Sequence, residues 1–411
     1  MESHFTANFF KGNRQRLRQL LNTSAPIAIA ANGLVQRGGD TTFNFAQDAV
    51  FWYLCGINEP DLTLIMEPSG DYLIVPPRSV TRETFDGAID VKQLSSLSGV
   101  TNVMDDREGW EKFTLQLKKN QQVALLSSPG DYIQSFGFYT NPARAALEKR
   151  VQQAKRDLEI LDISATIAKM RTVKQPEEIS AIQHAIDVTS ESLRELAMPS
   201  KIKDYKYEFQ VEAELTRGMR DRGLHHAFTP IIAGGKRACT LHNISNEGRL
   251  NRSDLVIIDT GAEAEHYAAD ITRTIHLGRP SKRQLEVHAA VKEVQQYTYS
   301  IIRPGILMRD FEHQVEDFMG QKLKQLGLLT EVTHEGVRRY YPHATSHFMG
   351  LNVHDSGDYS SPLPKGTVMT VEPGIYILEE GIGVRIEDDV LITDKGIQVL
   401  SSQLPTTMNL N

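Results

Sequence analysis

The sequence predicts an α+β fold organised in two domains. Its 411 residues exceed what one ordinary hydrophobic core organises, so two domains are expected. Hydrophobic residues make up 40% of the chain and charged residues 24%, which are values typical of a globular protein. Helical patterns and antiparallel strand patterns alternate without the regular βαβ rhythm of a doubly wound sheet, so α+β fits best.

The composition argues against several classes of function. No apolar stretch is long enough to cross a bilayer, and the first residues lack the apolar core of a signal peptide, so we expect a cytoplasmic protein with no membrane partner. A formal net charge of -7 makes nucleic acid a poor partner. Cys55 and Cys239 are far apart and lack zinc-type spacing, which predicts buried thiols and no disulfide framework.

The first half of the chain predicts a mixed sheet flanked by helices. Charged and apolar residues at helical spacing predict a helix over residues 13–21. Three apolar runs separated by Gly and Pro predict strands: residues 27–31, 62–66 and 72–75. The aromatic-rich segment 43–60 is expected to pack the core of this domain. A helix-forming stretch over residues 141–161, with Pro near its start, is expected to close it.

The second half begins with a change of pattern. Residues 169–176 are irregular, and an amphipathic helix follows in which Pro176 suits the first turn. We therefore place the domain boundary at about residue 168, which gives domains 1–167 and 168–411. Three more helices that end before Gly or Pro are expected over residues 208–222, 282–302 and 310–326.

Two aspartates occupy positions where carboxylates are costly. Residues 255–258 form an unbroken branched apolar run that predicts a strand buried on both faces, and Asp259 follows directly. After a polar turn, Asp270 alternates with apolar positions at the start of a second strand. If the strands pair as a hairpin, two buried anions lie close together and need a positive group between them. A hairpin whose aspartates face water at its rim explains the same stretch equally well.

Histidines gather further along the chain. The segment Y-P-H-A-T-S-H-F-M-G-L-N-V-H-D places His343, His347 and His354 within a dozen positions, beside Gly350. A single histidine here would indicate a structural group. Three of them in a glycine-containing segment indicate a functional site.

Charged residues also interrupt two apolar strands near the end of the chain. Glu372 ends an apolar strand before a Pro-Gly turn. In G-V-R-I-E-D-D-V-L-I, alternation places Arg385, Glu387 and Asp389 on one face of a single strand, where charged groups need partners. Each of four features has a harmless explanation by itself, such as edge-strand charges that deter aggregation. These features are the two aspartates, the histidine segment, Glu372 and the charged strand at Arg385, and such explanations account for all four together less well.

In order and spacing, five of these residues resemble the metal ligands of the pita-bread metallopeptidases: Asp259, Asp270, His347, Glu372 and Glu387. The flanking sequences D-T-G-A, D-I-T-R-T, S-H-F-M-G-L-N-V-H-D, V-E-P-G-I-Y and G-V-R-I-E-D-D also look like motifs of that family. Residues 43–60 and M-R-T-V-K-Q-P-E-E-I are similar to the N-terminal domain and the domain junction of its aminopeptidase P and prolidase branch. The resemblance implies a creatinase-like N-terminal domain followed by a pita-bread catalytic domain.

The same resemblance implies a dinuclear-metal aminopeptidase that cleaves the bond between a first residue and a following proline. It implies that His354 and Glu372 are catalytic, and that the substrate-binding residues are His242, His343 and Arg385. The implied partners are peptides with proline in the second position, and the implied assembly is a dimer or tetramer. Four carboxylates and one neutral imidazole would balance two divalent cations, and the oxygen-rich ligand set favours Mn(II).

Two other functions remain compatible with the sequence. A prolidase, which cuts only dipeptides, shares all five ligands. A non-catalytic relative would keep the pita-bread fold as a peptide-binding module. The segment S-H-F-M-G-L-N-V-H-D is closer to the aminopeptidase branch, and the complete ligand set counts against a non-catalytic protein.

Overall fold

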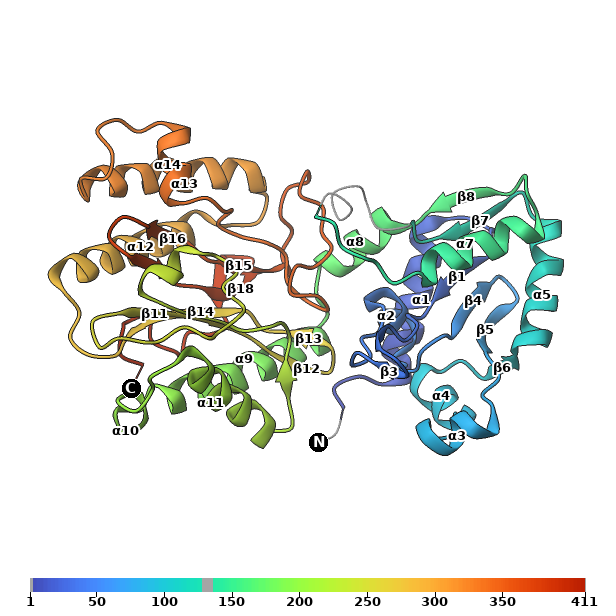
Figure 1. Ribbon diagram of the computed structural model, residues 1–411. Coiled ribbons are helices and arrows are strands. Elements are labelled where there is room, and N and C mark those ends of the chain that lie inside the picture. The colour runs from blue at the N-terminus through green and yellow to red at the C-terminus, as the bar shows by residue number, and fades with distance from the viewer. Residues whose placement is uncertain (1–2, 128–135, 411) are drawn as a thin grey trace. The chain divides into compact units, whose positions relative to one another are not determined.

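Figure 1 shows the computed structural model, which describes residues 3–127 and 136–410. The chain divides into two compact units, Met1–Met170 and Arg171–Asn411. The boundary that we expect at residues 167 and 168 lies three residues earlier, inside helix α8 (Ser164–Thr172). Helices and strands alternate irregularly in both units, as an α+β fold requires.

A six-stranded mixed sheet forms the centre of unit 1, in the order β6-β5-β4-β1-β7-β8. Its strands in chain order are β1 (Ile27–Ala30), β4 (Thr63–Glu67), β5 (Gly70–Val75), β6 (Asn102–Asp105), β7 (Gln122–Leu125) and β8 (Glu159–Asp162). Strand β1 is antiparallel to β4 and parallel to β7, so the mixed sheet is confirmed. The three apolar runs predicted as strands coincide with β1, β4 and β5.

Helices cover this sheet, and a small hairpin extends from it. The helices are α1 (Ala7–Leu21), α2 (Ala49–Cys55), α3 (Val80–Asp86), α4 (Val91–Ser98), α5 (Asp106–Lys119) and α7 (Ala143–Ala154), and the hairpin pairs β2 (Gln36–Gly38) with β3 (Thr41–Thr42). The helix expected over residues 141–161 is shorter, because its last residues pair with β7 as strand β8.

The aromatic segment of unit 1 packs as expected around helix α2. Asp48 begins this helix, since its carboxylate accepts hydrogen bonds from the backbone amides of Val50 and Phe51, each at 2.9 Å. Phe51 and Tyr53 are fully buried, whereas Phe43 at the start of the segment is exposed. Cys55 is a buried free thiol.

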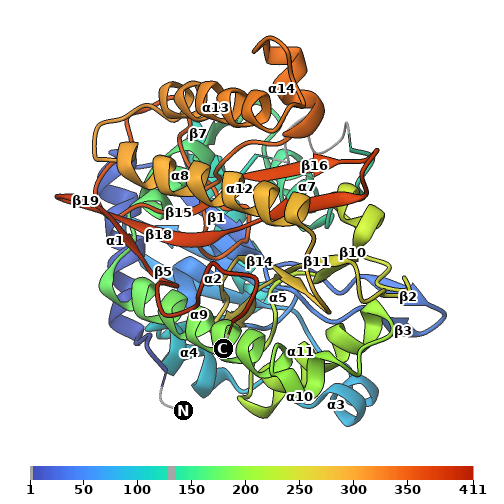
Figure 2. The ribbon, with the colours of Figure 1, turned by 90° about the vertical axis from the view of Figure 1, so that its left-hand side faces the viewer.

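In unit 2, two layers of helices enclose the strands. The helices are α9 (Pro176–Leu196), α10 (Pro199–Ile202), α11 (Glu208–Asp221), η1 (Gly235–Cys239), α12 (Lys282–Ile301), α13 (Met308–Gln325) and α14 (His334–Tyr340). Figure 2 shows α12 and α13 on one side of the strands and α9 and α11 on the other. Apolar residues of α12 and α13 form one continuous core with the strands beneath them. The predicted helices at Pro176 and at residues 208–222, 282–302 and 310–326 are confirmed.

Small antiparallel sheets make up the strand layer of unit 2. Its first six strands are β9 (His225–His226), β10 (Ile231–Gly234), β11 (Leu255–Thr260), β12 (Ala262–Ala264), β13 (Tyr267–Ala268) and β14 (Ile271–His276). The remaining five are β15 (Val368–Val371), β16 (Gly374–Ile377), β17 (Ile382–Arg385), β18 (Asp388–Thr393) and β19 (Gly396–Val399). Strand order is β10-β11-β14 in one sheet and β15-β18-β19 in another. Within the described residues, no helix combines the length and apolar character that a membrane span requires.

The predicted hairpin of β11 and β14 is confirmed, with Asp259 opposite Thr272. The polar turn that we expect between its strands is instead a second hairpin, β12 with β13. This segment pairs because Ala264 and Tyr267 are buried. Glu265 and His266 form the tip of that hairpin with φ angles of 48° and 69°, the left-handed backbone that a tight hairpin turn needs.

The single strand expected across Arg385 and Asp389 is interrupted. Strand β17 ends at Arg385 and pairs with β16, whereas β18 begins at Asp388 and pairs with β15. Between them, the amides of Ile386 and Glu387 donate to the carbonyl oxygens of Pro373 and Thr272, at 3.3 and 3.1 Å. These two hydrogen bonds fix the backbone where it passes from the sheet of β16 and β17 to the sheet of β15 and β18.

Candidate metal centre and active site

The five residues predicted as metal ligands line one cavity of about 250 Å³ in unit 2. They are Asp259 of β11, Asp270 just before β14, His347 after α14, Glu372 just after β15, and Glu387 between β17 and β18. Segments more than a hundred residues apart in the sequence therefore meet at this point. The hairpin aspartates face this cavity rather than open water, with Asp259 8% and Asp270 4% exposed.

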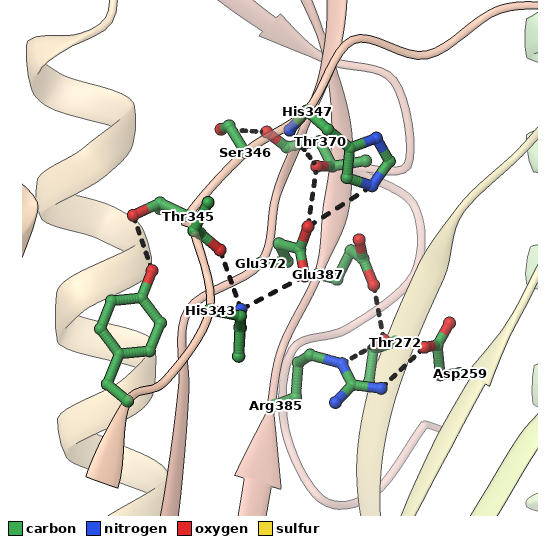
Figure 3. A network of polar contacts seen from close by, with 12 residues as sticks. Asp259, Thr272, His343, Thr345, Ser346, His347, Thr370, Glu372, Arg385 and Glu387 are labelled. Atoms are coloured by element: carbon green, nitrogen blue, oxygen red, sulfur yellow. Dashed lines mark hydrogen bonds and ion pairs between the residues drawn. The ribbon is translucent and has the colours of Figure 1, made fainter. Parts of the chain in front are cut away.

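Short distances connect the polar groups of this cavity, as Figure 3 shows. His347 Nε2 lies 3.4 Å from Asp270 Oδ2 and 3.4 Å from Glu372 Oε1. Asp270, His347 and Glu387 each offer one ligand atom, and these atoms all lie within 4.8 Å of one another. Such a group of carboxylates and one imidazole has the dimensions and the donor types that hold a divalent cation.

The charges of the carboxylates support this fit. Burial, together with the neighbouring Asp259, holds the pKa of Asp270 well above its ordinary value. Burial and the nearby Asp270 raise the pKa of Glu387 in the same way. The Oδ1 atom of Asp259 is buried without a hydrogen-bond partner among the described residues. Because buried carboxylates at this spacing cannot all ionise by themselves, the residues present fit a site for divalent cations.

Glu387 and Asp389, which spacing alone does not distinguish, have different surroundings. Glu387 lines the cavity, and its Oε2 accepts a hydrogen bond of 2.6 Å from Thr272 Oγ1. Asp389 Oδ2 instead accepts a hydrogen bond of 3.0 Å from the backbone amide of Asp270. Asp389 therefore supports the segment that presents Asp270.

Arg385 supplies positive charge beside the aspartates. Its Nη2 donates to Asp259 Oδ2 at 2.7 Å, its Nε to Thr272 Oγ1 at 3.1 Å and its Nη1 to the Tyr376 hydroxyl at 2.9 Å. Burial by itself lowers the pKa of Arg385, but the neighbouring Tyr376, Asp259 and Glu387 raise it well above its ordinary value. The guanidinium is therefore a permanent cation in the cavity wall.

His343 is tied to the same network. Its Nε2 lies 2.8 Å from the Tyr376 hydroxyl, and its Nδ1 lies 3.6 Å from Glu372 Oε2. Burial and the charge of Arg385 lower the pKa of His343 to about 3. The imidazole is therefore neutral at physiological pH and can both donate and accept a hydrogen bond.

His242 and His354 occupy the more exposed part of the cavity lining. The ring of His354 lies 4.2 Å from the ring of His347, measured between centroids. Neither His242 nor His354 makes a side-chain hydrogen bond within residues 3–127 and 136–410. Both imidazoles are thus available to a molecule that enters the cavity.

All nine predicted site residues line the cavity. Four of them are histidines, four are carboxylates, and the ninth is Arg385. Two further residues, Thr272 and Tyr376, connect members of this set and are not among the predicted site residues. Thr272 lies in β14 two positions after Asp270, so the alternation of side chains is the signal that both face the same way. Tyr376 belongs to the V-E-P-G-I-Y motif, but its contact with His343 and Arg385 needs three separate segments to meet.

Known proteins resemble this chain over almost its full length. Residues 180–394 match the metallopeptidase family M24, and residues 10–125 match the aminopeptidase P N-terminal domain. The chain is 32% identical to Xaa-Pro aminopeptidase 3 of Mus musculus, with 94% of this chain and 80% of that protein covered. It is 29% identical to Xaa-Pro aminopeptidase of Haemophilus influenzae, with coverage of 96% and 94%.

A solved structure is similar as well. Zn-substituted Escherichia coli aminopeptidase P in complex with product superposes with a TM-score of 0.85 and 27% identity, covering 98% of this chain and 97% of that chain. The predicted family resemblance and the predicted fold, an aminopeptidase P N-terminal domain followed by a pita-bread catalytic domain, are confirmed. From its matched sequence, its fold and its cavity of carboxylates and histidines, the chain belongs to the metallopeptidase family M24.

Proposed function

We propose that this protein is a dinuclear-metal aminopeptidase that hydrolyses the bond between an N-terminal residue and a following proline. The observation that carries the proposal is the convergence of the five predicted ligands on one cavity. The similarity to Xaa-Pro aminopeptidases over 94% or more of the chain supports the same substrate class. Peptides with proline in the second position are the partners that this function requires.

In this proposal the metal ligands are Asp259, Asp270, His347, Glu372 and Glu387. The four carboxylates carry four negative charges, which two divalent cations balance, and Mn(II) suits a site with mostly oxygen ligands. Bound cations of this kind polarise a carbonyl group and lower the pKa of a water molecule. The relative solved with zinc shows that the cation of a similar protein can be replaced, so Mn(II) stays a prediction.

Two residues would handle protons. Glu372 lies at the end of β15, where Thr370 Oγ1 donates to its Oε1 at 3.3 Å, and its carboxylate would accept the proton of the attacking water. His354 lines the cavity, and its imidazole makes no hydrogen bond to the described part of the chain, so it would donate a hydrogen bond to the carbonyl oxygen as negative charge develops there. Each such contribution is worth roughly a hundredfold in rate.

Three further residues would bind the substrate. His343 is held by Tyr376, and Arg385 by Asp259, so both present fixed donors to the proline side of the cavity. His242 is exposed and would line the approach. Proline lacks an amide hydrogen and has a restricted φ, so a rigid pocket recognises it by shape.

Several further expectations from the sequence stay predictions. These are the domain division into residues 1–167 and 168–411, the cytoplasmic location, and assembly as a homodimer or homotetramer. A non-catalytic peptide-binding role is less consistent with a cavity that gathers all five ligands. A prolidase shares the same metal site, so only the substrate distinguishes it from an aminopeptidase.

One assay tests the proposal. Metal-reconstituted protein is incubated with Ala-Pro, Ala-Pro-Ala and Ala-Ala-Ala, and free alanine is measured. We expect rapid release of alanine from Ala-Pro-Ala and little from Ala-Ala-Ala. Cleavage of Ala-Pro alone would identify a prolidase, and no cleavage of any peptide by protein that holds metal would contradict catalysis.

A further inference from the structure

His354 depends on its loop for its position. Its imidazole makes no hydrogen bond to the described part of the chain, and residues 349–357 have neither helical nor strand structure. In contrast, His347 and His343 are each fixed by at least one contact of their ring nitrogens. Whatever holds the backbone of this loop therefore sets where the His354 ring lies.

Asp355, the next residue, anchors the loop. Its side chain is 1% exposed, and Oδ1 forms an ion pair with Arg171 Nη2 while Oδ2 lies 3.4 Å from Lys174 Nζ. Its backbone amide donates to the carbonyl oxygen of Phe348 at 2.8 Å, which closes the loop around His354. Adjacent residues thus point into different surroundings, His354 into the cavity and Asp355 into a buried pair of cations.

Lys174 and its neighbour Val173 pair with the residues that lead into β15, the strand before Glu372. The amide of Lys174 donates to the carbonyl oxygen of Gly366 at 2.9 Å, and Val173 forms a bridge with Thr367 just before β15. The ammonium group of Lys174 also donates to the carbonyl oxygen of Arg171. Strand β15 ends one residue before Glu372. Residues 171–174 therefore contact both Asp355, which is next to His354, and the residues that lead into the strand before Glu372.

The loop fits closely around this cluster. A Cβ atom added at Gly350 would lie 2.3 Å from Asp355 Oδ2 and 2.9 Å from Lys174 Cε, so only glycine leaves room there. The side chains of Arg171 and Lys174 are 2% and 1% exposed, and Arg171 Nε has no hydrogen-bond partner among the described residues. Within the described residues, Asp355 forms the ion pairs with both buried cations. Lys174 also interacts with the buried carboxylate of Glu178, so loss of Asp355 would leave chiefly the buried charge of Arg171 uncompensated.

We propose that Arg171, Lys174 and Asp355 are positioning residues. They hold the loop of residues 349–357, which carries His354, in a fixed position relative to Glu372. The proposal rests on the aminopeptidase function proposed above and adds residues that touch neither substrate nor metal. The ion cluster determines the distance between the imidazole and the reacting carbonyl, whereas the cavity itself determines metal binding. A displacement of about 1 Å at such a position costs up to a hundredfold in rate.

The decisive variant is Asp355→Asn, which keeps the size of the side chain and removes its charge. We expect kcat for Ala-Pro-Ala to fall by about tenfold or more, with KM and bound metal per chain within about twofold of the wild type. Independently of activity, hydrogen exchange of peptides covering residues 348–357 should accelerate by about tenfold or more, with and without metal. Wild-type kcat together with wild-type exchange in this variant would overturn the proposal.

Asp71→Asn provides the matched control. Asp71 is also shared by two arginines, Arg14 and Arg18, but lies in unit 1. We expect it to leave kcat and the exchange of residues 348–357 unchanged, so an equal effect in this variant would overturn a specific role for Asp355. If Asp355→Asn does not fold, Lys174→Met keeps the Arg171 pair and should show the same changes in smaller degree; unchanged kcat and exchange in that variant overturn the proposal.

The two proposals can fail separately. If wild-type protein with bound metal does not cleave Ala-Pro-Ala, the proposed function fails. The exchange measurement still decides whether the cluster holds the loop. If the wild type cleaves and Asp355→Asn leaves both kcat and exchange unchanged, only the positioning role fails.

Discussion

Arg385 Nη2 donates to Asp259 Oδ2 at 2.7 Å, while the other carboxylate oxygen of Asp259 is buried without a hydrogen-bond partner in the described part of the chain. One oxygen is thus occupied by a protein cation, and the other is left for a ligand. Because a lone buried acceptor is costly, this arrangement fits an aspartate that shares its charge between an arginine and a metal ion.

Substituting Arg385→Lys should reduce kcat/KM for Ala-Pro-Ala by about a hundredfold. Lysine keeps the charge but cannot reach Asp259, Thr272 and Tyr376 together as the guanidinium fork does. Steady-state kinetics would measure the effect. Arg283→Lys, at a surface pair with Glu380, is the control and should change kcat/KM by less than about twofold. Equal kinetics of the two variants would contradict a role for the fork.

Substituting Asp270→Asn should abolish turnover and weaken metal uptake. The variant removes a ligand carboxylate whose pKa burial and the neighbouring Asp259 hold well above its ordinary value in metal-free protein. Added Mn(II) should therefore raise the melting temperature of the wild type clearly and that of the variant little. Thermal unfolding with and without a chelator measures this difference. A variant with normal turnover and the full metal-dependent shift would contradict the ligand assignment.

The buried pair of Arg273 and Asp388 should stabilise the strands behind the metal site. Arg273 Nη2 donates to Asp388 Oδ1 at 2.6 Å, and its Nη1 donates to the carbonyl oxygen of Glu387 at 2.6 Å. Asp388→Asn should lower the free energy of unfolding by about 3–5 kcal/mol, because the buried guanidinium loses its counter-ion. Denaturant titration would test it. Asp394→Asn, at an exposed pair with Lys365, should cost less than about 1 kcal/mol.

His288 should make stability depend on pH. Burial, with Lys292 and Arg273 nearby, lowers its pKa from 6.5 to about 4. The unfolded chain therefore binds a proton that the folded chain does not bind between pH 6.5 and 4, so the stability present above pH 6.5 is lost as pH falls. The contribution is up to roughly 3 kcal/mol.

His288→Leu should flatten the fall in unfolding free energy between pH 7 and pH 4, measured by denaturant titration at each pH. His313→Leu, on the exposed side of α13, serves as the control and should leave the slope as in the wild type. An unchanged slope in His288→Leu would show that this imidazole does not titrate with unfolding.

The local pattern of residues predicts most of the secondary structure. Branched apolar runs place β1, β4 and β11, because a strand buried on both faces needs little beyond its own sequence to be recognised. Pro and Gly mark the ends of α9, α12 and α13 for the same local reason. The interruption between β17 and β18 was not predictable, since it depends on the carbonyl groups of Thr272 in β14 and of Pro373 between β15 and β16.

The same distinction between local sequence and tertiary contacts applies to the candidate site. By itself the sequence predicted the fold class and, through the resemblance of its motifs to those of the pita-bread metallopeptidases, nine of the residues that line the cavity. Only the tertiary structure decided that Asp389 supports Asp270, that Arg385 pairs with Asp259, and that Asp355 is buried between two cations. Hydrogen bonds and ion pairs join residues that are distant in sequence, and their partners exist only after the chain has packed.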